Sequence, residues 1–187
     1  MILPVYLYGH TALRQKSEDI TKDYPDIEQL ISDMFETMYK AEGVGLAAPQ
    51  IGKNINIFVV DSAILVEEKN KEDKENLKNF KKTFINPKIT FNSDKKLHVE
   101  EGCLSVPSIH EKVLRYADIT VEYLNENFET VVENFKNTKA RIIQHEYDHL
   151  QGTIFVDKIS PIRKRFIKNN LNTIIKGKSK TSYKTKV

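Results

Sequence analysis

Two histidines and a glutamate stand at a spacing that suits metal chemistry, because His145, Glu146 and His149 fall in the run HEYDH. No Pro or Gly interrupts residues 141–151, so we expect this run to lie on a helix of about three turns. The two histidines then lie one above the other on one helix face. Two imidazoles at that spacing can bind one metal ion, and Glu146 beside them can reach a water on that ion. Such a site would produce hydroxide at neutral pH.

The same two histidines can instead be hydrogen-bonded residues of a protein core. Their helix is expected to be buried on most sides, because it also carries several apolar side chains: Ile142, Ile143, Tyr147 and Leu150. Asn137 or Thr138 can cap its start, and Gly152 can end it. The motif therefore predicts a metal site but leaves a purely structural role open.

The chain has one cysteine, Cys103, which cannot form an internal disulfide and suits a reducing cytosol. A lone cysteine is most often a small buried core residue. A Cys103 thiolate within reach of the two histidines would instead complete three protein ligands and leave a fourth tetrahedral position for water. Cys103 and His145 are 42 positions apart, and this spacing cannot establish the contact.

A second long helix is predicted ahead of these residues. Apolar side chains repeat at helical spacing between residues 26 and 41, with Pro25 at the entry and Gly43 just past the end. We expect its apolar face to pack against the helix of His145. A shorter helix is predicted from His10 to Lys16.

Short apolar segments separated by turn residues predict antiparallel strands. They cover residues 55–60, 88–91, 97–100, 111–115, 119–124 and 128–133, the last two joined by a hairpin turn at 125–127. Residues 61–82 are rich in charge and are expected to form an exposed excursion between strands. The predicted fold class is α+β, with antiparallel strands packed around a central helix that carries HEYDH.

Residues 42–52, EGVGLAAPQIG, are rich in small side chains and predict neither a regular helix nor a regular strand. One explanation is a tight turn between a helix and a strand. Another is a backbone wall of a substrate cleft, in which the side-chain amide of Gln50 is a hydrogen-bond donor. The segment lacks the Gly-Lys-Ser/Thr ending of a phosphate-binding loop, so it does not predict phosphate binding.

Charge is distributed unevenly along the chain. The net charge is +3, yet residues 161–187 hold nine Lys or Arg and no acidic residue. We expect residues 1–165 to form one domain and residues 166–187 a basic tail that is partly helical or disordered, with a helix able to continue over 161–175. Either a solvated end or an anionic partner such as RNA explains this tail. With no run of about 18 apolar residues, no membrane span is predicted.

Three segments together resemble the signature motifs of the peptide deformylase family. They are residues 43–50 (GVGLAAPQ), 101–105 (EGCLS) and 144–149 (QHEYDH), in the family's order and at fitting separations. The resemblance extends from about Leu3 to the mid-160s, and three motifs together are highly specific. It implies a cytoplasmic enzyme whose catalytic domain covers residues 1–165. The implied reaction removes the formyl group from the N-terminal formyl-methionine of new polypeptides and releases formate.

The resemblance also implies a metal site and a catalytic base. Cys103, His145 and His149 would bind one divalent ion, Fe2+ above all, with Zn2+, Ni2+ or Co2+ able to occupy the site. The ion lowers the pKa of its bound water, Glu146 takes the proton, and the resulting hydroxide attacks the formyl carbonyl.

Five further residues are expected to act on the substrate. The Gln50 side-chain amide and the Leu104 backbone N–H would stabilise the oxyanion together with the metal. An extended peptide could add as a strand beside Gly45 and the strand before Cys103. Val44 and Ile142 are expected to form walls of an apolar pocket for the methionine side chain.

Two positions depart from the usual family pattern. His110 stands where many bacterial members have an arginine, and Asn137 stands where a glycine often precedes the catalytic helix. Neither change removes a ligand or the base. We take His10, His98 and His110 as surface or structural histidines. The family context favours a monomer whose basic tail docks at the ribosome.

Two other function classes compete with this interpretation. A zincin-like metallopeptidase shares the paired histidines and the glutamate, but its third ligand normally lies downstream as Glu or His. After His149 this chain has neither, and Asp157 is the one acidic residue there. The other class is a non-enzymatic module that binds RNA or the ribosome and uses the metal only as a structural staple.

Overall fold

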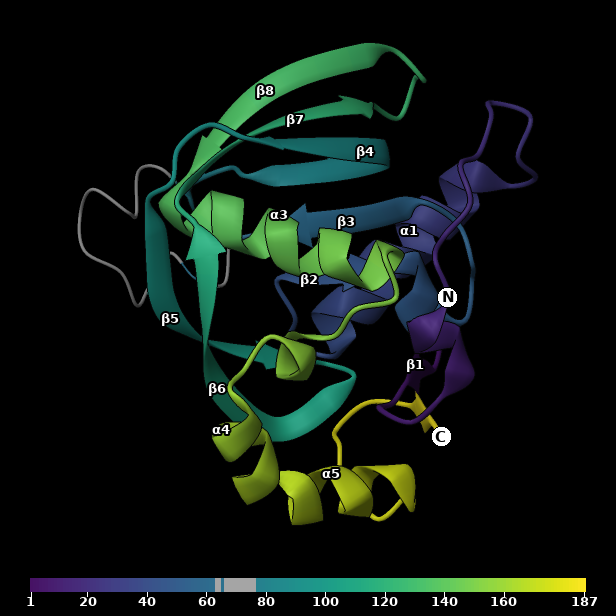
Figure 1. Cartoon of the computed structure of the whole chain (residues 1–187). Coiled ribbons are helices and arrows are strands. Elements are labelled where there is room, and N and C mark those ends of the chain that lie inside the picture. Colours follow the sequence, from purple (N-terminus) through teal and green to yellow (C-terminus); the bar gives the residue numbers. More distant parts are fainter. Residues whose placement is uncertain (63–64, 66–76) are drawn as a thin grey trace.

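An antiparallel sheet of five strands is the centre of the computed structural model, which describes residues 1–62, 65 and 77–187. Its spatial order is β2-β3-β4-β7-β8, so β2 and β8 are the edge strands (Figure 1). The strands are β2 (Gly45–Ala47), β3 (Ile57–Asp61), β4 (Lys81–Phe91), β7 (Asp118–Leu124) and β8 (Thr130–Lys136). The α+β class with antiparallel strands around a central helix is confirmed.

The two long helices, α1 (Ile27–Lys40) and α3 (Asn137–Leu150), pack on opposite faces of this sheet. Ile57 and Val59 of β3 share an apolar cluster with α1, whereas Phe58 and Val60 share another with α3. Successive side chains of a strand point to opposite faces, so β3 separates the helices. The expectation that the first helix packs against the second is therefore wrong, because apolar periodicity identifies a buried face and not its partner.

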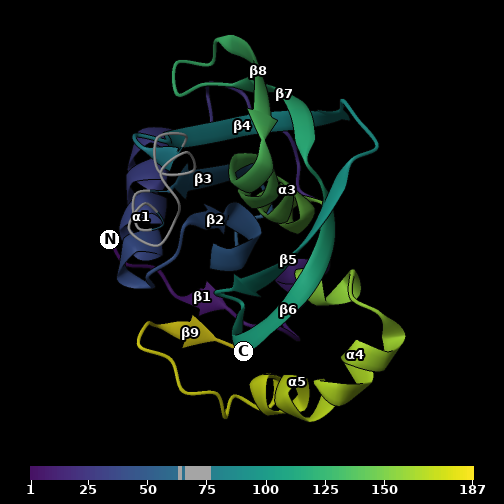
Figure 2. The same ribbon diagram turned by 90° about the vertical axis from the view of Figure 1, so that its left-hand side faces the viewer.

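A long hairpin curves along the side of this core and ends at the cysteine. It consists of β5 (Lys96–Cys103) and β6 (Val106–Tyr116), which form a separate two-stranded sheet (Figure 2). The register shifts between Glu101 and Cys103, and Cys103 pairs with Val106 across the turn. Both strands exceed their predicted lengths, because the pairing continues beyond the apolar segments that identified them.

The start of α3 is not capped as predicted. Lys136 is the N-cap residue and makes no side-chain cap, while Asn137 is already the first helical residue. Asn137 has φ of 51° and donates its backbone N–H to the Ala117 carbonyl at 2.8 Å. A left-handed residue is therefore required at this corner, which asparagine tolerates better than most residues other than glycine.

The glycine-rich segment is more regular than expected. Residues Gly45–Ala47 form β2, which pairs with β3, and the 3-10 turn η2 (Ala48–Ile51) follows it. The predicted excursion at 61–82 falls mostly on residues 63–64 and 66–76, which lie outside the described residues. Its ends belong to β3 and β4.

The N- and C-terminal segments pack together around a third apolar cluster. The remaining elements are β1 (Val5–Tyr6), the 3-10 turns η1 (Thr11–Arg14) and η4 (Phe155–Asp157), α4 (Pro161–Phe166), α5 (Lys168–Ile175) and β9 (Thr185–Lys186). Leu171 and Ile174 of α5 share this cluster with Leu7 and Leu13. The continuous helix expected over 161–175 is broken at Ile167, which is buried in the same cluster. In the described part of the chain, no helix combines the length and apolar character needed to cross a membrane.

Candidate metal and catalytic site

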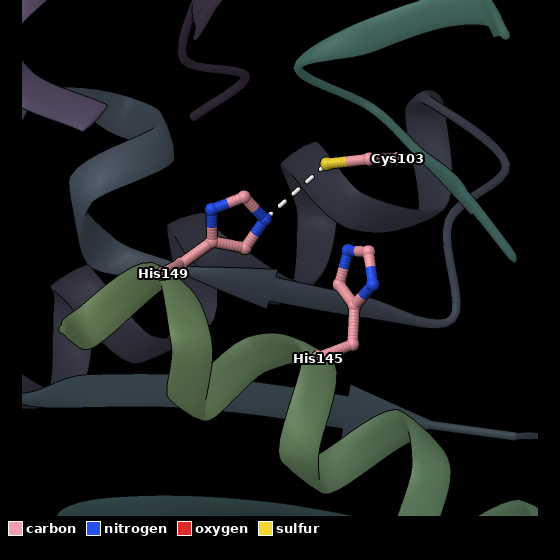
Figure 3. A group of neighbouring side chains, drawn as sticks. All are labelled: Cys103, His145 and His149. Atoms are coloured by element: carbon pink, nitrogen blue, oxygen red, sulfur yellow. Dashed lines mark hydrogen bonds between the residues drawn. The ribbon is translucent and has the colours of Figure 1, made fainter. Parts of the chain in front are cut away.

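Three side chains that can bind a metal meet where the β5–β6 hairpin passes α3. His145 and His149 project from successive turns of α3 toward Cys103 at the end of β5 (Figure 3). Their ligand atoms lie within 4.8 Å of one another, and Cys103 Sγ is 3.2 Å from His149 Nε2. Ligands at typical bond lengths around a tetrahedral ion stand about 3.6 Å apart, so the donor set fits one divalent ion. The fold thus brings together residues whose spacing alone could not place them.

A buried carboxylate orients the first histidine. His145 Nδ1 lies 3.1 Å from Glu101 Oε2, which leaves Nε2 as the ring nitrogen free to bind a metal. Glu101 also accepts hydrogen bonds from Arg115 Nε at 2.6 Å and Arg141 Nη1 at 2.5 Å. Burial alone would raise the pKa of Glu101, but the hydrogen bonds from His145 and Arg115 hold this pKa well below its usual range. Glu101 therefore stays an anion beside His145.

The pKa values of the two histidines are shifted in opposite directions. Burial opposes charge on both rings. For His145, hydrogen bonds with Cys103 and Glu101 outweigh burial and raise its pKa to about 10. For His149, burial and the neighbouring positive charge of His145 lower its pKa well below the usual value. Because metal ligands must be deprotonated, binding of an ion would release a proton from this cluster.

Glu146 lies beside the cluster and is suited to proton transfer. It is 4% exposed, and its Oε2 is buried without a hydrogen-bond partner among the described residues. Burial raises its pKa to about 7, close to the value that serves a general base at neutral pH. A Cβ atom added at Gly45 would stand 2.7 Å from Glu146 Cδ. Gly45 is therefore required by the close approach of this carboxylate to β2.

The side chain of Gln50 is held with its amide group facing the cysteine. Its Oε1 accepts the Ala47 backbone N–H at 2.8 Å, which leaves Nε2 to face Ser105 Oγ at 3.2 Å and Cys103 Sγ at 3.6 Å. Leu104 and Ser105 form the turn between β5 and β6. The fold thus places Gln50 and the Leu104–Ser105 turn next to Cys103, and Ser105 had not been selected by sequence reasoning.

The predicted peptide-binding residues lie at the β2 edge of the sheet and on the helix α3. Gly45 begins β2, which is an edge strand. Val44 packs against the apolar cluster that contains Ile142. The two proposed pocket walls, one in α3 and one just before β2, therefore pack into the same apolar region.

The remaining histidines lie outside the donor cluster. His10 Nδ1 accepts the Ala12 backbone N–H at 3.1 Å and so begins η1. His98 Nε2 stands 3.1 Å from the Lys112 carbonyl oxygen. His110 is exposed and approaches Gly102, where an added Cβ would meet His110 Nε2 at 2.8 Å.

Two features of the site were missed by sequence reasoning, although one signal for Glu101 was present. Metal-binding histidines commonly donate their second ring N–H to a carboxylate, and Glu101 lies two residues before Cys103 in a predicted strand. The buried ion pair of Arg115 with Asp148 at 2.7 Å had no such signal, since it joins residues from β6 and α3. Asp157, the one acid after His149, forms an ion pair with Arg14 away from the donor cluster, which leaves the zincin alternative without a downstream ligand.

Known proteins resemble the chain over nearly its whole length. The model of the family "Polypeptide deformylase" matches residues 2–165. The peptide deformylase of Christiangramia forsetii is 47% identical over 98% of this chain and 95% of the relative. That of Flavobacterium psychrophilum is 47% identical over 100% of this chain and 97% of the relative.

Solved structures of similar fold are also peptide deformylases. A crystal structure of peptide deformylase from Plasmodium falciparum has a TM-score of 0.81 and 34% identity, covering 92% of this chain and 95% of that one. The peptide deformylase of Thermus thermophilus has a TM-score of 0.80 and 36% identity, covering 95% of this chain and 99% of that one. With three motifs meeting at one cluster that could bind a metal, the chain belongs to the peptide deformylase family of hydrolases, which remove the N-terminal formyl group from new polypeptides.

Proposed function

We propose that Cys103, His145 and His149 hold one divalent metal ion and that this site deformylates formyl-methionyl polypeptides. The observation that carries the proposal is the meeting of these three donors beside the buried, unpartnered Oε2 of Glu146. A structural metal site has no need of such a carboxylate, since burying an unpartnered polar atom costs stability. A hydrolase needs it to accept a proton.

Each step of the reaction then has a group to perform it. A bound divalent ion supplies a Lewis acid and lowers the pKa of water at the site. Glu146 removes a proton from the water that attacks the formyl carbon, and later gives a proton to the leaving amine. The Gln50 Nε2 group and the Leu104 backbone N–H donate hydrogen bonds to the carbonyl oxygen as it gains negative charge. Formate and a free N-terminal amine are the products.

We infer that the peptide binds in an extended conformation between β2 and the end of β5. The edge position of β2 supports this inference, because an edge strand can pair with an added strand, here beside Gly45. Val44 and Ile142 would line the pocket for methionine. Recognition through main-chain hydrogen bonds would tolerate many sequences after methionine.

The bound ion in the cell is proposed to be Fe2+. A thiolate and two imidazoles also suit Zn2+, Ni2+ and Co2+, so the donor set does not select among them. The reaction itself changes no oxidation state, so oxidation of the iron or of Cys103 would inactivate the enzyme without being part of its cycle.

We further propose a cytoplasmic monomer whose basic C-terminal helices contact the ribosome. Ile162 and Phe166 of α4 are 70% and 73% exposed beside a group of cationic residues: Arg163, Lys164, Arg165 and Lys168. Phosphate contacts would make this binding dependent on salt. Co-sedimentation with ribosomes at low salt should fall for Arg165→Glu with Lys168→Glu, and an unchanged result would reject the contact.

The proposed function is tested by formate release from a short formyl-methionyl peptide, with anaerobically purified protein, with and without a chelator. We expect release that the chelator stops and that added metal restores, with no cleavage inside the peptide. Metal-loaded protein that releases no formate would refute the proposal. Cleavage of internal bonds would favour the metallopeptidase alternative.

A further inference from the structure

The end of the chain returns to the active site after the C-terminal helices. β9 pairs in parallel with β1, where the Val5 backbone N–H donates to the Lys184 carbonyl at 2.9 Å (Figures 1 and 2). Just before β9, the half-buried Tyr183 donates its hydroxyl to the Leu104 carbonyl oxygen at 2.7 Å. Tyr183 lies beyond residue 165, where the match to the family model ends.

The carbonyl that Tyr183 contacts belongs to the central peptide group of the β5–β6 turn. Cys103 and Val106 pair across the hairpin, so Leu104 and Ser105 form its two-residue turn. The peptide between the two central residues of a β-turn is the one whose orientation differs between turn types. A donor on the Leu104 carbonyl therefore fixes the orientation of the turn that follows Cys103.

Other contacts hold the same turn from different directions. The Leu104 side chain lies against Gly43, where an added Cβ would stand 2.8 Å from Leu104 Cδ1. The Ser105 carbonyl accepts the Tyr8 backbone N–H at 2.8 Å, and Ser105 Oγ faces Gln50 Nε2. These contacts fix the Leu104 side chain and Ser105, and the Tyr183 hydroxyl fixes the carbonyl between them.

The Tyr183 hydroxyl keeps its proton under the conditions in which the enzyme works. Burial, and next the negative charge of the nearby Cys103, raise the pKa of Tyr183 to about 12. A protonated hydroxyl can donate to a carbonyl oxygen, whereas a phenolate cannot.

We propose that Tyr183 is a positioning residue of the deformylase site, whose hydroxyl holds the Leu104 carbonyl and thereby sets the directions of Cys103 Sγ and the Leu104 N–H. The inference rests on the proposed function and deepens it, because the C-terminal tail then completes the active site. The Tyr183 hydroxyl reaches the Leu104 carbonyl and so acts through the turn.

The test compares full-length Tyr183→Phe with the unaltered protein, both loaded with Co2+. Visible absorption reports the geometry of the cobalt ligands, and a chelator in excess measures the rate of cobalt release. Losing one hydrogen bond is expected to speed release and to lower kcat, each by about fivefold to tenfold, with KM changed by less than about twofold. The cobalt absorption bands should also shift.

Lys186→Met provides the matched control in the same tail. It removes the contact of Lys186 Nζ with the Tyr6 hydroxyl at 3.3 Å but leaves Tyr183 in place. We expect this variant to match the unaltered protein in spectrum, cobalt release and kcat. Equal effects of both substitutions would overturn the specific role of Tyr183, as would an unaltered spectrum and release rate in Tyr183→Phe. If the unaltered cobalt protein releases no formate, the proposed function fails, while the spectra and release rates still decide the role of Tyr183.

Discussion

His145 Nδ1 donates to Glu101 Oε2 over 3.1 Å, and this contact joins a proposed metal ligand to a buried network of charges. Glu101 in turn accepts hydrogen bonds from Arg115, which also reaches Asp148 at 2.7 Å. Arg115 has a side chain that is 2% exposed, so its charge depends on these partners. The network joins β5, β6 and α3 at the point where the three proposed metal ligands meet.

Replacing Glu101 by Gln should weaken both metal binding and folding. Loss of the carboxylate beside a histidine ligand typically lowers metal affinity by about 10-fold to 100-fold. Arg115 would keep Asp148 but lose its charged partner Glu101, which should cost about 1–3 kcal/mol of unfolding free energy. Metal titration and urea unfolding measure the two effects. The exposed neighbour provides the control, and Glu100→Gln should leave both quantities unchanged; equal effects of the two substitutions would contradict the proposed role of Glu101.

Replacing Gly45 by Ala should displace the proposed base. An added methyl group would stand 2.7 Å from Glu146 Cδ and force the carboxylate away from β2. We expect kcat to fall at least about 10-fold, with a stability loss of about 1–3 kcal/mol from overpacking. Metal content should stay unchanged, because the ligands lie on α3 and β5. Full activity in Gly45→Ala would show that Glu146 is not held in the position assigned to it.

Replacing Val44 by Asp should reduce the preference for formyl-methionine. Val44 packs beside the apolar cluster of Ile142, and a charge there would disfavour burial of an apolar side chain. The ratio of kcat/KM for formyl-methionyl and formyl-alanyl peptides measures this preference. Val132→Asp, at a valine that is 61% exposed, should leave the ratio unchanged. An unchanged ratio in Val44→Asp would remove Val44 from the pocket.

The ion pair between Arg14 and Asp157 should stabilise the fold only above acidic pH. Burial opposes ionisation of Asp157, but hydrogen bonds from Arg14, the Ile154 N–H and Lys164 outweigh it and lower the pKa of Asp157. A pKa lowered by folding adds stability that is complete above the unfolded value and is lost as the pH falls through the folded one. Arg14 is 40% exposed, so the gain is about 1 kcal/mol or less.

Urea unfolding of Asp157→Asn and the unaltered protein, both with chelator, tests this pH dependence. The stability difference between the two proteins should be present at pH 6 and shrink toward pH 3. A difference that stays constant over this range would show that the charge of Asp157 does not contribute.

Sequence reasoning was most successful where the pattern was local. The apolar repeat over 26–41 predicted α1, which spans Ile27–Lys40, because helical periodicity depends only on nearby residues. The HEYDH run likewise predicted α3 and the common face of its histidines. The residues that lie beside these histidines were harder to predict, because the positions of Cys103 and Glu101 depend on how β5 passes α3.

Features formed by distant and short segments could not be predicted. β1 and β9 pair over only two residues each, and Tyr6 and Lys186 are 180 positions apart. Two residues carry no periodic signal, so neither strand nor the contact of Tyr183 could be foreseen. The break at Ile167 has the same origin, since burial of this residue in a tertiary cluster overrides the helical pattern of 161–175.

Glu146 is proposed to transfer the proton at a metal site built by Cys103, His145 and His149. The most direct measurement compares metal content and formate release in Glu146→Gln, with Glu122→Gln at an exposed position as the control. We predict full metal content and an unchanged fold for Glu146→Gln, with formate release lower by about 100-fold to 10,000-fold. Formate release near the unaltered rate, with metal bound, would show that Glu146 does not transfer the proton.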